Sequence, residues 1–141
     1  MSLPALGAAD KVALAEESHF VNDEAKGLTY AGSHLLIDVW DATRLDDLEH
    51  VKQTLTRAVD AAGATLLRID LHRFTDNGGI SGVAVLAESH MSIHTWPELG
   101  YAALDVFMCG NCDPYLTLPV LREAFAPERV QVAEHKRGVI A

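Results

Sequence analysis

Residues 78–110 have the sequence GGISGVAVLAESHMSIHTWPELGYAALDVFMCG, in which two apolar segments enclose a polar one. The first apolar segment, 80–87, is apolar almost throughout, which is typical of a strand buried on both faces. The second, 101–109, is predicted to be another strand. The polar segment begins with Glu88-Ser89, where the serine hydroxyl is placed to attack the carbonyl of the residue before it.

The sequence on either side of this segment predicts two helices and further strands. Apolar residues recur every three or four positions over 45–62, which indicates a helix that Gly63 ends. Asp113-Pro114 is a typical start for a second helix. A loop is predicted at 76–79, whose Asp, Asn and Gly residues tolerate positive φ. Three more strands are predicted at 33–40, 65–74 and 130–135.

The predicted order is strand, helix, strand, strand, strand, helix, strand. This order indicates an α/β fold of the α+β type, a two-layer sandwich with a mostly antiparallel sheet and two helices on one face. The other face also carries apolar side chains, so we expect it to pack against the sheet of a second copy in a homodimer. Residues 1–31 are small and acidic without a lasting period, which predicts a loosely ordered N-terminal extension, and 32–141 form the domain.

The composition limits the classes of function. A chain of 141 residues with 49% hydrophobic and 22% charged residues is typical of one soluble globular domain. A net charge of −9 argues against nucleic-acid binding, which needs clustered Lys and Arg. The sequence shows no secretory signal and no apolar stretch near the ~18 residues of a membrane span, so we expect a cytoplasmic protein without membrane contact.

Ser89 is a candidate nucleophile, although a serine after an apolar strand is most often a small core residue. Self-cleavage requires a bent Glu88-Ser89 bond, donors for the developing oxyanion, and a base that removes the Cα proton from the resulting ester. His94 offers a neutral imidazole for the last task. Ser81 would donate to the oxyanion only if a chain reversal brings it near Ser89.

The segment 78–110 resembles the core signature of the small bacterial and archaeal S-adenosylmethionine decarboxylases. The resemblance extends from about 32 to 138 and includes His72-Arg73-Phe74 and the closing EHKRG. Its ESH…IHTWPE element is long enough to be specific. Proteins of this family make a pyruvoyl cofactor from one of their own serines.

The resemblance implies a role for each matching residue. Ser89 would be the nucleophile of an N→O acyl shift, and β-elimination would leave it as a pyruvoyl group after cleavage between Glu88 and Ser89. Ser81 and His94 match residues that assist this processing. Cys109 matches the residue that protonates the substrate carbon after carbon dioxide leaves.

The resemblance also implies a substrate. Phe74 and Trp96 match aromatic positions near the nucleoside, and Glu98 matches the carboxylate that holds the ribose hydroxyls. S-adenosylmethionine would be decarboxylated to the aminopropyl donor for spermidine synthesis, without a metal. Relatives with the same signature act on arginine or ornithine, so these substrates stay an alternative.

Rival readings come from other classes of protein. Cys109, Cys112, His90 and His94 offer the ligand types of a zinc-binding module. In an extended chain, however, the Cα atoms of His90 and His94 would lie roughly 13 Å apart, too far for one ion. Cysteine hydrolase chemistry through Cys109 and His94 lacks a third orienting group. His90 is more simply a hydrogen-bonded core histidine, and an uncleaved, noncatalytic relative is the remaining alternative.

Overall fold

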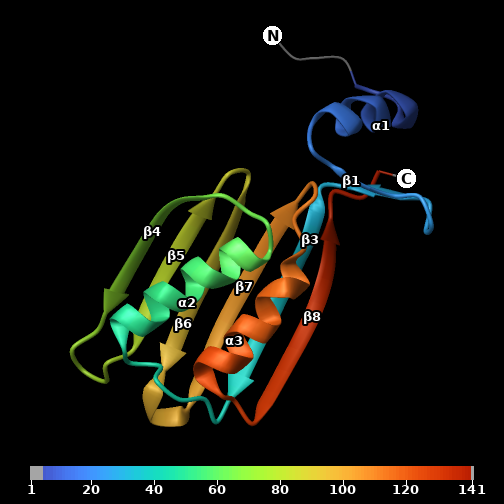
Figure 1. Ribbon diagram of the computed structural model, residues 1–141. Helices are drawn as coiled ribbons and strands as arrows, with labels where there is room; N and C mark the ends of the chain where they lie inside the picture. Colours follow the sequence, from blue (N-terminus) through green and yellow to red (C-terminus); the bar gives the residue numbers. More distant parts are fainter. Residues whose placement is uncertain (1–4, 141) are drawn as a thin grey trace.

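The computed structural model describes residues 5–140, which form one six-stranded antiparallel sheet, two helices on one of its faces, and a small N-terminal unit (Figure 1). The sheet has the strand order β4-β5-β6-β7-β3-β8. Its strands are β3 (Gly32–Trp40), β4 (Leu66–Arg73), β5 (Ile80–Leu86), β6 (Ser89–Trp96), β7 (Tyr101–Cys109) and β8 (Arg129–Arg137). The helices α2 (Leu48–Ala61) and α3 (Thr117–Phe125) cover one face, so the predicted two-layer α+β sandwich is confirmed.

The strand β6 is missing from the predicted order of elements. It alternates strictly, because Met91, Ile93 and Thr95 are buried beneath the helices. The intervening His90 and His94 face the other side of the sheet, and such polar residues hide a strand from an apolar count. With β6 in place, β5 and β6 form a hairpin that carries Ser89 at its tip.

An aspartate caps α2, and another caps the short 3-10 helix that precedes α3. The Asp47 carboxylate accepts the backbone N–H of His50 at 3.0 Å, so α2 begins three residues later than predicted. Gly63, with φ 80°, ends it as expected. Asp113 accepts the N–H of Tyr115 at 3.0 Å, and the short 3-10 helix η2 (Pro114–Leu116) leads into α3.

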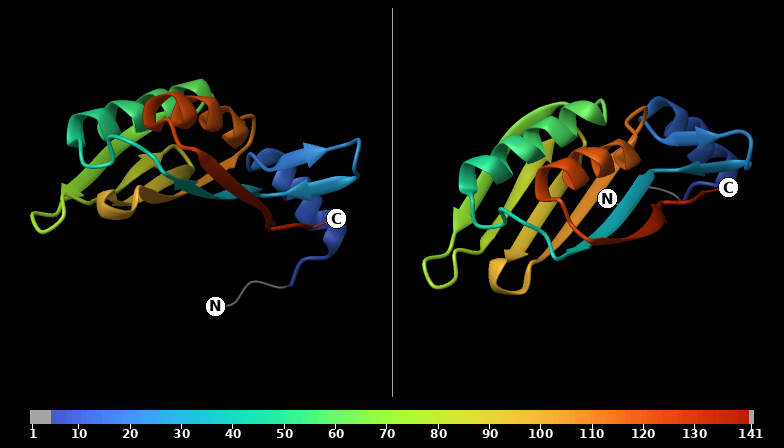
Figure 2. Two further views of the ribbon diagram at one scale, coloured as in Figure 1. Left: turned by 90° about the horizontal axis from the view of Figure 1, so that it is seen from below. Right: turned by 60° about the horizontal axis from the view of Figure 1, so that its bottom comes forward.

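The core lies between the helices and the sheet. The α2 side chains Val51, Leu55 and Val59 are fully or almost fully buried there, as is Phe125 of α3. Burying one such side chain contributes roughly 1.5–3 kcal/mol, so this layer is the main source of stability. Figure 2 shows that α2 and α3 lie on the same side of the sheet, which leaves the opposite face without a helix. We call this opposite face the open face.

The N-terminal extension contains regular elements, in contrast to the expected loose ordering. Helix α1 (Ala8–Glu17) is followed by a hairpin of β1 (Val21–Asp23) and β2 (Leu28–Tyr30). Figure 1 places this unit beside the C-terminal end of the chain, where Ile140 N donates to Thr29 O at 2.8 Å. The division of the chain at residue 31 stays a prediction. Among residues 5–140, no helix combines the length and the apolar character needed to cross a membrane.

Candidate active site

The Glu88-Ser89 bond lies in the two-residue turn of the β5–β6 hairpin. Leu86 pairs with Ser89 across the ladder, so Ala87 and Glu88 make the turn. Glu88 has φ 67°, a left-handed conformation that costs a non-glycine residue about 1–2 kcal/mol. The bond is therefore bent at an exposed position, which is the first requirement for attack by the serine hydroxyl.

Cys109 approaches this bond from the end of β7. Its Sγ donates to the carbonyl oxygen of Glu88 at 3.3 Å and lies 3.7 Å from Oγ of Ser89. The contact arises because β7 pairs with β6 and ends beside the hairpin turn. The thiol is thus a donor at the carbonyl that would become an oxyanion, a role expected of Ser81 only if a chain reversal brought it near Ser89.

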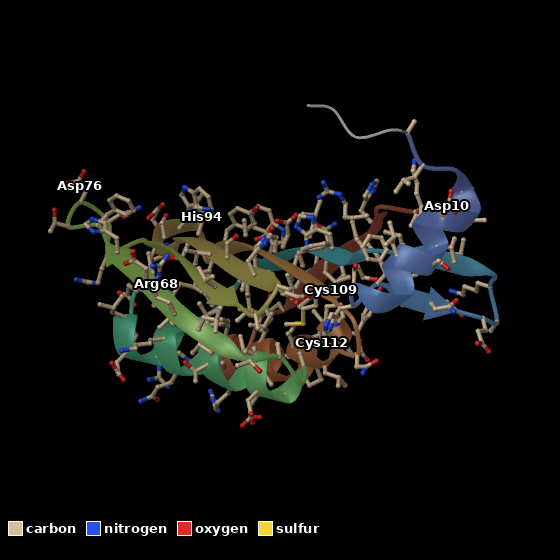
Figure 3. The ribbon with its side chains drawn as sticks, turned by 90° about the horizontal axis from the view of Figure 1, so that it is seen from above. Asp10, Arg68, Asp76, His94, Cys109 and Cys112 are labelled. Atoms are coloured by element: carbon tan, nitrogen blue, oxygen red, sulfur yellow. The ribbon has the colours of Figure 1, made fainter. Side chains whose placement is uncertain are left out.

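Ser81 and His94 form a second polar pair on the open face. They are directly opposed in the β5–β6 ladder, and Ser81 Oγ lies 2.9 Å from Nδ1 of His94. His94 is five residues beyond Ser89 in the same strand, which corresponds to roughly 16 Å. Figure 3 shows His94 and Cys109 well separated along the sheet. One chain therefore does not bring Ser81 and His94 to Ser89.

The predicted substrate-binding residues gather around the Ser81–His94 pair. A pocket of about 340 Å³ is lined by Phe74, Trp96, Ser81 and His94, among others. Phe74 and Trp96 are 47% and 39% exposed, which is unusual for large aromatic side chains and leaves ring surface free for a ligand. Glu98 is connected to this pocket by a hydrogen bond of 2.8 Å from Asn77, which lines it.

Trp96 is the outer ring of a stack of three aromatic side chains. The Trp96 ring lies on Tyr101 with a centroid distance of 5.2 Å, and Tyr101 lies on Trp40 at 4.3 Å, both with an interplanar angle of 24°. The Tyr101 hydroxyl donates to Asp38 at 2.6 Å, and this hydrogen bond raises the pKa of Tyr101 to about 12. The stack holds the plane of Trp96 on the open face.

A polar cluster of four residues lies between the two pairs on the open face. Asp105 accepts from Nε2 of His34 at 2.6 Å and of His90 at 3.0 Å, and also from the Ser92 hydroxyl. Burial alone would raise the pKa of Asp105, but the hydrogen bonds from Ser92, His34 and His90 outweigh it and lower this pKa. His90 is thus hydrogen-bonded, as predicted, but its side chain is 40% exposed on the open face and is not part of the core.

The two histidines and Asp105 are close enough together to hold a cation, but the hydrogen bonds give a different explanation. Arg137 lies 3.3 Å from Nδ1 of His34. A guanidinium only donates, so Nδ1 accepts and Nε2 carries the proton that His34 gives to Asp105. Hydrogen bonds therefore account for both ring nitrogens of His34.

The four residues of the zinc alternative do not converge. His90 and His94 are four residues apart in β6, which corresponds to roughly 13 Å. Cys112 donates to Gly63 O at 3.4 Å, and burial raises the pKa of its thiol. The zinc interpretation is not favoured.

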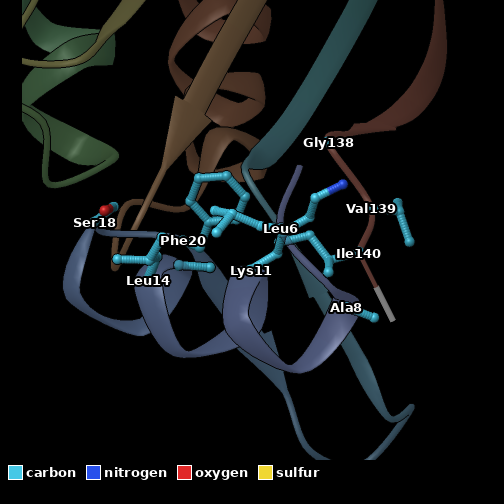
Figure 4. Close-up of a pocket in the computed structure, with 10 residues that line it drawn as sticks. Leu6, Ala8, Lys11, Leu14, Ser18, Phe20, Gly138, Val139 and Ile140 are labelled. Atoms are coloured by element: carbon cyan, nitrogen blue, oxygen red, sulfur yellow. The ribbon is translucent and has the colours of Figure 1, made fainter. Parts of the chain in front are cut away.

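A further pocket of about 490 Å³ lies between α1 and the C-terminal segment (Figure 4). Its lining includes the apolar side chains of Leu6, Leu14, Phe20 and Ile140, and Lys11 contributes one charged group. The predicted site residues are all elsewhere, so this pocket is separate from the candidate active site.

Several residues around the site were not predicted from the sequence, among them Asn77, His34 and Asp105. Asn77 belongs to the predicted loop 76–79, where its side chain could only be noted as turn-forming. Side chains alternate between the two faces along β3 and β7, and this alternation places His34 and Asp105 on the open face. Asp105 could have been noticed because it is the one charged residue in the otherwise apolar strand 101–109.

Comparison with known proteins identifies the family of this chain. A family model described as S-adenosylmethionine decarboxylase matches residues 33–138. The S-adenosylmethionine decarboxylase proenzymes of Thermomicrobium roseum and Methanococcus vannielii are 46% and 48% identical to this chain over 110 and 112 residues. These matches cover 77% of this chain and 95% and 91% of the two relatives.

Solved structures show the same fold. The adenosylmethionine decarboxylase of Aquifex aeolicus superposes with a TM-score of 0.71 at 33% identity, covering 79% of this chain and 94% of that one. The Trypanosoma brucei enzyme, at 17% identity and a TM-score of 0.50, shares the fold alone. The matched segment, its extent and the bent Glu88-Ser89 turn lead to one conclusion: this chain belongs to the S-adenosylmethionine decarboxylase family.

Proposed function

We propose that this chain cleaves itself between Glu88 and Ser89 and then decarboxylates S-adenosylmethionine. The observation that carries the proposal is the arrangement at the hairpin tip. There the left-handed Glu88 turns the scissile carbonyl toward the Cys109 thiol, and Ser89 Oγ lies 3.7 Å from that thiol. The left-handed turn at Glu88, the Ser89 nucleophile and the Cys109 donor thus meet at one peptide bond.

The cleavage needs only groups of this chain and water. Ser89 Oγ attacks the carbonyl carbon of Glu88, the C–N bond breaks, and an ester forms while the amino group of Ser89 is released. A base then removes the Cα proton of Ser89, and the Glu88 carboxylate leaves. Water replaces the nitrogen at residue 89, ammonia departs, and a pyruvoyl group begins the second fragment.

The residues around Ser89 fit such a group. Its position at the first residue of β6 keeps it in the sheet after the chain is cut, because the ladders to β5 and β7 remain. The pyruvoyl group supplies an electron sink for the bond that breaks to the carboxylate. The Cys109 thiol, beside it, then serves as the proton donor to the substrate carbon.

The substrate pocket explains the choice of S-adenosylmethionine. The exposed Trp96 and Phe74 offer aromatic surface for a purine and for the neighbouring sulfonium cation. Glu98, an acceptor of two hydroxyl groups, lies beyond Trp96 and suits the ribose. Arginine and ornithine lack both a ring and adjacent hydroxyls, and the pocket would leave them poorly held.

We also infer that the active protein is a homodimer joined through its open faces. Ser89 with Cys109, and Ser81 with His94, occupy opposite ends of the β5–β6 hairpin, roughly 16 Å apart. A two-fold arrangement of two open faces would place the Ser81–His94 pair of one copy over the Ser89 of the other. The large apolar side chains of Leu36 in β3 and Trp96 in β6 are exposed on this face and would be covered in such a dimer.

The first test is the denatured intact mass of the wild-type protein beside a Ser89→Ala variant. Wild type should give two fragments divided after Glu88 whose masses add up to the precursor plus about 1 Da, since water enters and ammonia leaves. Simple hydrolysis would instead add about 18 Da. The Ser89→Ala variant should stay whole, and an uncut wild-type chain would contradict the proposal.

The second test is substrate choice. Carbon dioxide release is measured with the cleaved protein from S-adenosylmethionine, arginine and ornithine in parallel. We expect release from S-adenosylmethionine only. Release from arginine or ornithine instead would move the chain to another substrate while leaving its self-cleavage intact.

A further inference from the structure

Asn77 has a defined orientation in the loop between β4 and β5. Its Oδ1 accepts the backbone N–H of Gly79 at 2.8 Å, and its Nδ2 donates to Oε2 of Glu98 at 2.8 Å. The first hydrogen bond identifies which end of the amide is oxygen, so the second is donated to the carboxylate. The Asn77 side chain therefore connects the loop to a residue 21 positions further along the chain.

The loop that carries Asn77 is itself held in one arrangement. Gly78 N donates to Phe74 O at 3.0 Å, and Phe74 N donates to Gly79 O at 2.8 Å. A Cβ at Gly79 would lie 2.7 Å from Thr95 O and 2.9 Å from Oδ1 of Asn77, so only glycine fits there. These contacts make the loop a fixed support for the Asn77 amide.

Glu98 depends on such a support. It is exposed in the 3-10 helix η1 (Pro97–Leu99), and an exposed glutamate side chain samples many rotamers. The hydrogen bond from Asn77 uses one position on Oε2 and leaves the other lone pairs of the carboxylate free to accept. Asn77 and Trp96 line the same pocket, so the carboxylate is held beside the aromatic wall.

We propose that Asn77 is a positioning residue that fixes the Glu98 carboxylate for the two ribose hydroxyls and so sets the preference for a ribonucleoside substrate. This inference rests on the proposed function. Without the amide, Glu98 must be ordered each time a substrate binds, which weakens binding and leaves the chemical step unchanged. Asn77 is therefore expected to affect KM and not kcat.

The experiment compares Asn77→Ala and Asn77→Asp with the wild type, using S-adenosylmethionine and its 2′,3′-dideoxyribose analogue. With S-adenosylmethionine, Asn77→Ala should raise KM about 10-fold at nearly constant kcat, since hydrogen bonds to charged groups have about this effect. Asn77→Asp should raise it further, because a second carboxylate would then face Glu98. With the dideoxy analogue, all three proteins should have similar KM values.

Two controls separate the possible outcomes. Thr75→Ala, an exposed position in the same loop that does not line the pocket, should leave both constants unchanged. The double variant Asn77→Ala/Glu98→Gln should be no worse than Glu98→Gln alone. The inference would be overturned if Asn77→Ala left KM for S-adenosylmethionine unchanged, or if it raised KM equally for the dideoxy analogue. A wild type that releases no carbon dioxide from S-adenosylmethionine would instead contradict the proposed function.

Discussion

At the scale of single residues, the candidate site depends on a left-handed turn position that is usually occupied by glycine in hairpins. Glu88 has a left-handed backbone at φ 67°, and its carbonyl accepts the Cys109 thiol at 3.3 Å. Backbone strain and a positioned donor therefore act on the same carbonyl group. Both can be removed one at a time.

Replacing Cys109 tests the donor. Cys109→Ala should slow self-cleavage by up to about 100-fold, because removal of one oxyanion donor has effects of this order. Cys109→Ser, which keeps a donor, should lose less. The rate is read from the decay of the precursor mass. Cys112→Ala is the matched control, since its thiol contacts Gly63 O, and slowing in that variant as well would argue for a general effect on folding.

Replacing Glu88 tests the strain. In an uncleaved Ser89→Ala background, Glu88→Gly should raise the free energy of unfolding by about 1 kcal/mol, because glycine adopts the left-handed conformation without the Cβ penalty. Urea denaturation measures the change. Ala87→Gly, at the neighbouring turn position without positive φ, should give no such gain, and equal stabilisation by both substitutions would contradict a specific strain at Glu88.

At the scale of elements, the polar cluster connects the three neighbouring strands β6, β7 and β3. Asp105 in β7 accepts from His90 and Ser92 in β6 and from His34 in β3. These hydrogen bonds lie between the hairpin tip with Ser89 and the pocket with His94. The cluster therefore keeps the two ends of the site in a fixed relation along the sheet.

The low pKa of Asp105 predicts a dependence of stability on pH. A carboxyl whose pKa is lower in the folded state stabilises that state above its unfolded pKa of about 3.9, and the contribution is lost as the pH falls below it. Between about pH 5 and pH 3, roughly one unit on either side of that pKa, the free energy of unfolding of the Ser89→Ala protein should fall more steeply than that of the same protein with Asp105→Asn. The difference between the two proteins should therefore shrink as the pH is lowered. Asp70→Asn, at an exposed position on the edge strand β4, is the control, and parallel curves for Asp105→Asn would contradict the assignment.

At the scale of the whole molecule, and for residues 5–140, the sheet has helices on one face and none on the other. Ser81 and His94 lie on this open face, whereas Ser89 and Cys109 lie at the hairpin tip at the end of the sheet, which is why the proposed homodimer matters for catalysis. In such a dimer, residues from both copies would complete each site.

Mixed dimers test this division directly. A Ser89→Ala chain cannot be cut, and a His94→Ala chain should be cut slowly when alone. When the two chains are coexpressed, they should form heterodimers. In these, His94 of the Ser89→Ala chain meets Ser89 of the His94→Ala chain, so the His94→Ala chain is cleaved. Intact mass identifies which chain is cut, and no gain over the separate variants would place all processing groups within one chain.

The interface itself is tested by a charge at its centre. Leu36→Asp on the open face should convert the protein from dimer to monomer, because a buried carboxylate without a partner costs several kcal/mol. Sedimentation of the variant beside the wild type gives the oligomeric state. Leu67→Asp, at an exposed apolar position of the edge strand β4, serves as the control that should stay dimeric, and a monomeric wild type would reject the dimer.

The sequence alone determined the sandwich and its two helices, and it predicts Glu88-Ser89 as the bond that is cut. Helical and strand periods come from the chain itself, because burial selects apolar residues at 3.6 or 2 residue intervals. The strand β6 was not found this way, since its His90, Ser92 and His94 face the open side and interrupt the apolar pattern. The residues of the site were named from a local motif, which is contiguous in sequence.

Only the tertiary structure decided which of these residues meet. Ser89 and Cys109 are 20 positions apart and come together because β7 ends at the β5–β6 turn. Asn77 and Glu98 are 21 positions apart and meet because the β4–β5 loop and η1 lie at the same end of the sheet. His94, only five residues from Ser89, lies roughly 16 Å away because an extended strand separates neighbours in sequence by ~3.3 Å each. Nearness in sequence fixes the motif, whereas strand pairing and chain reversal fix the contacts.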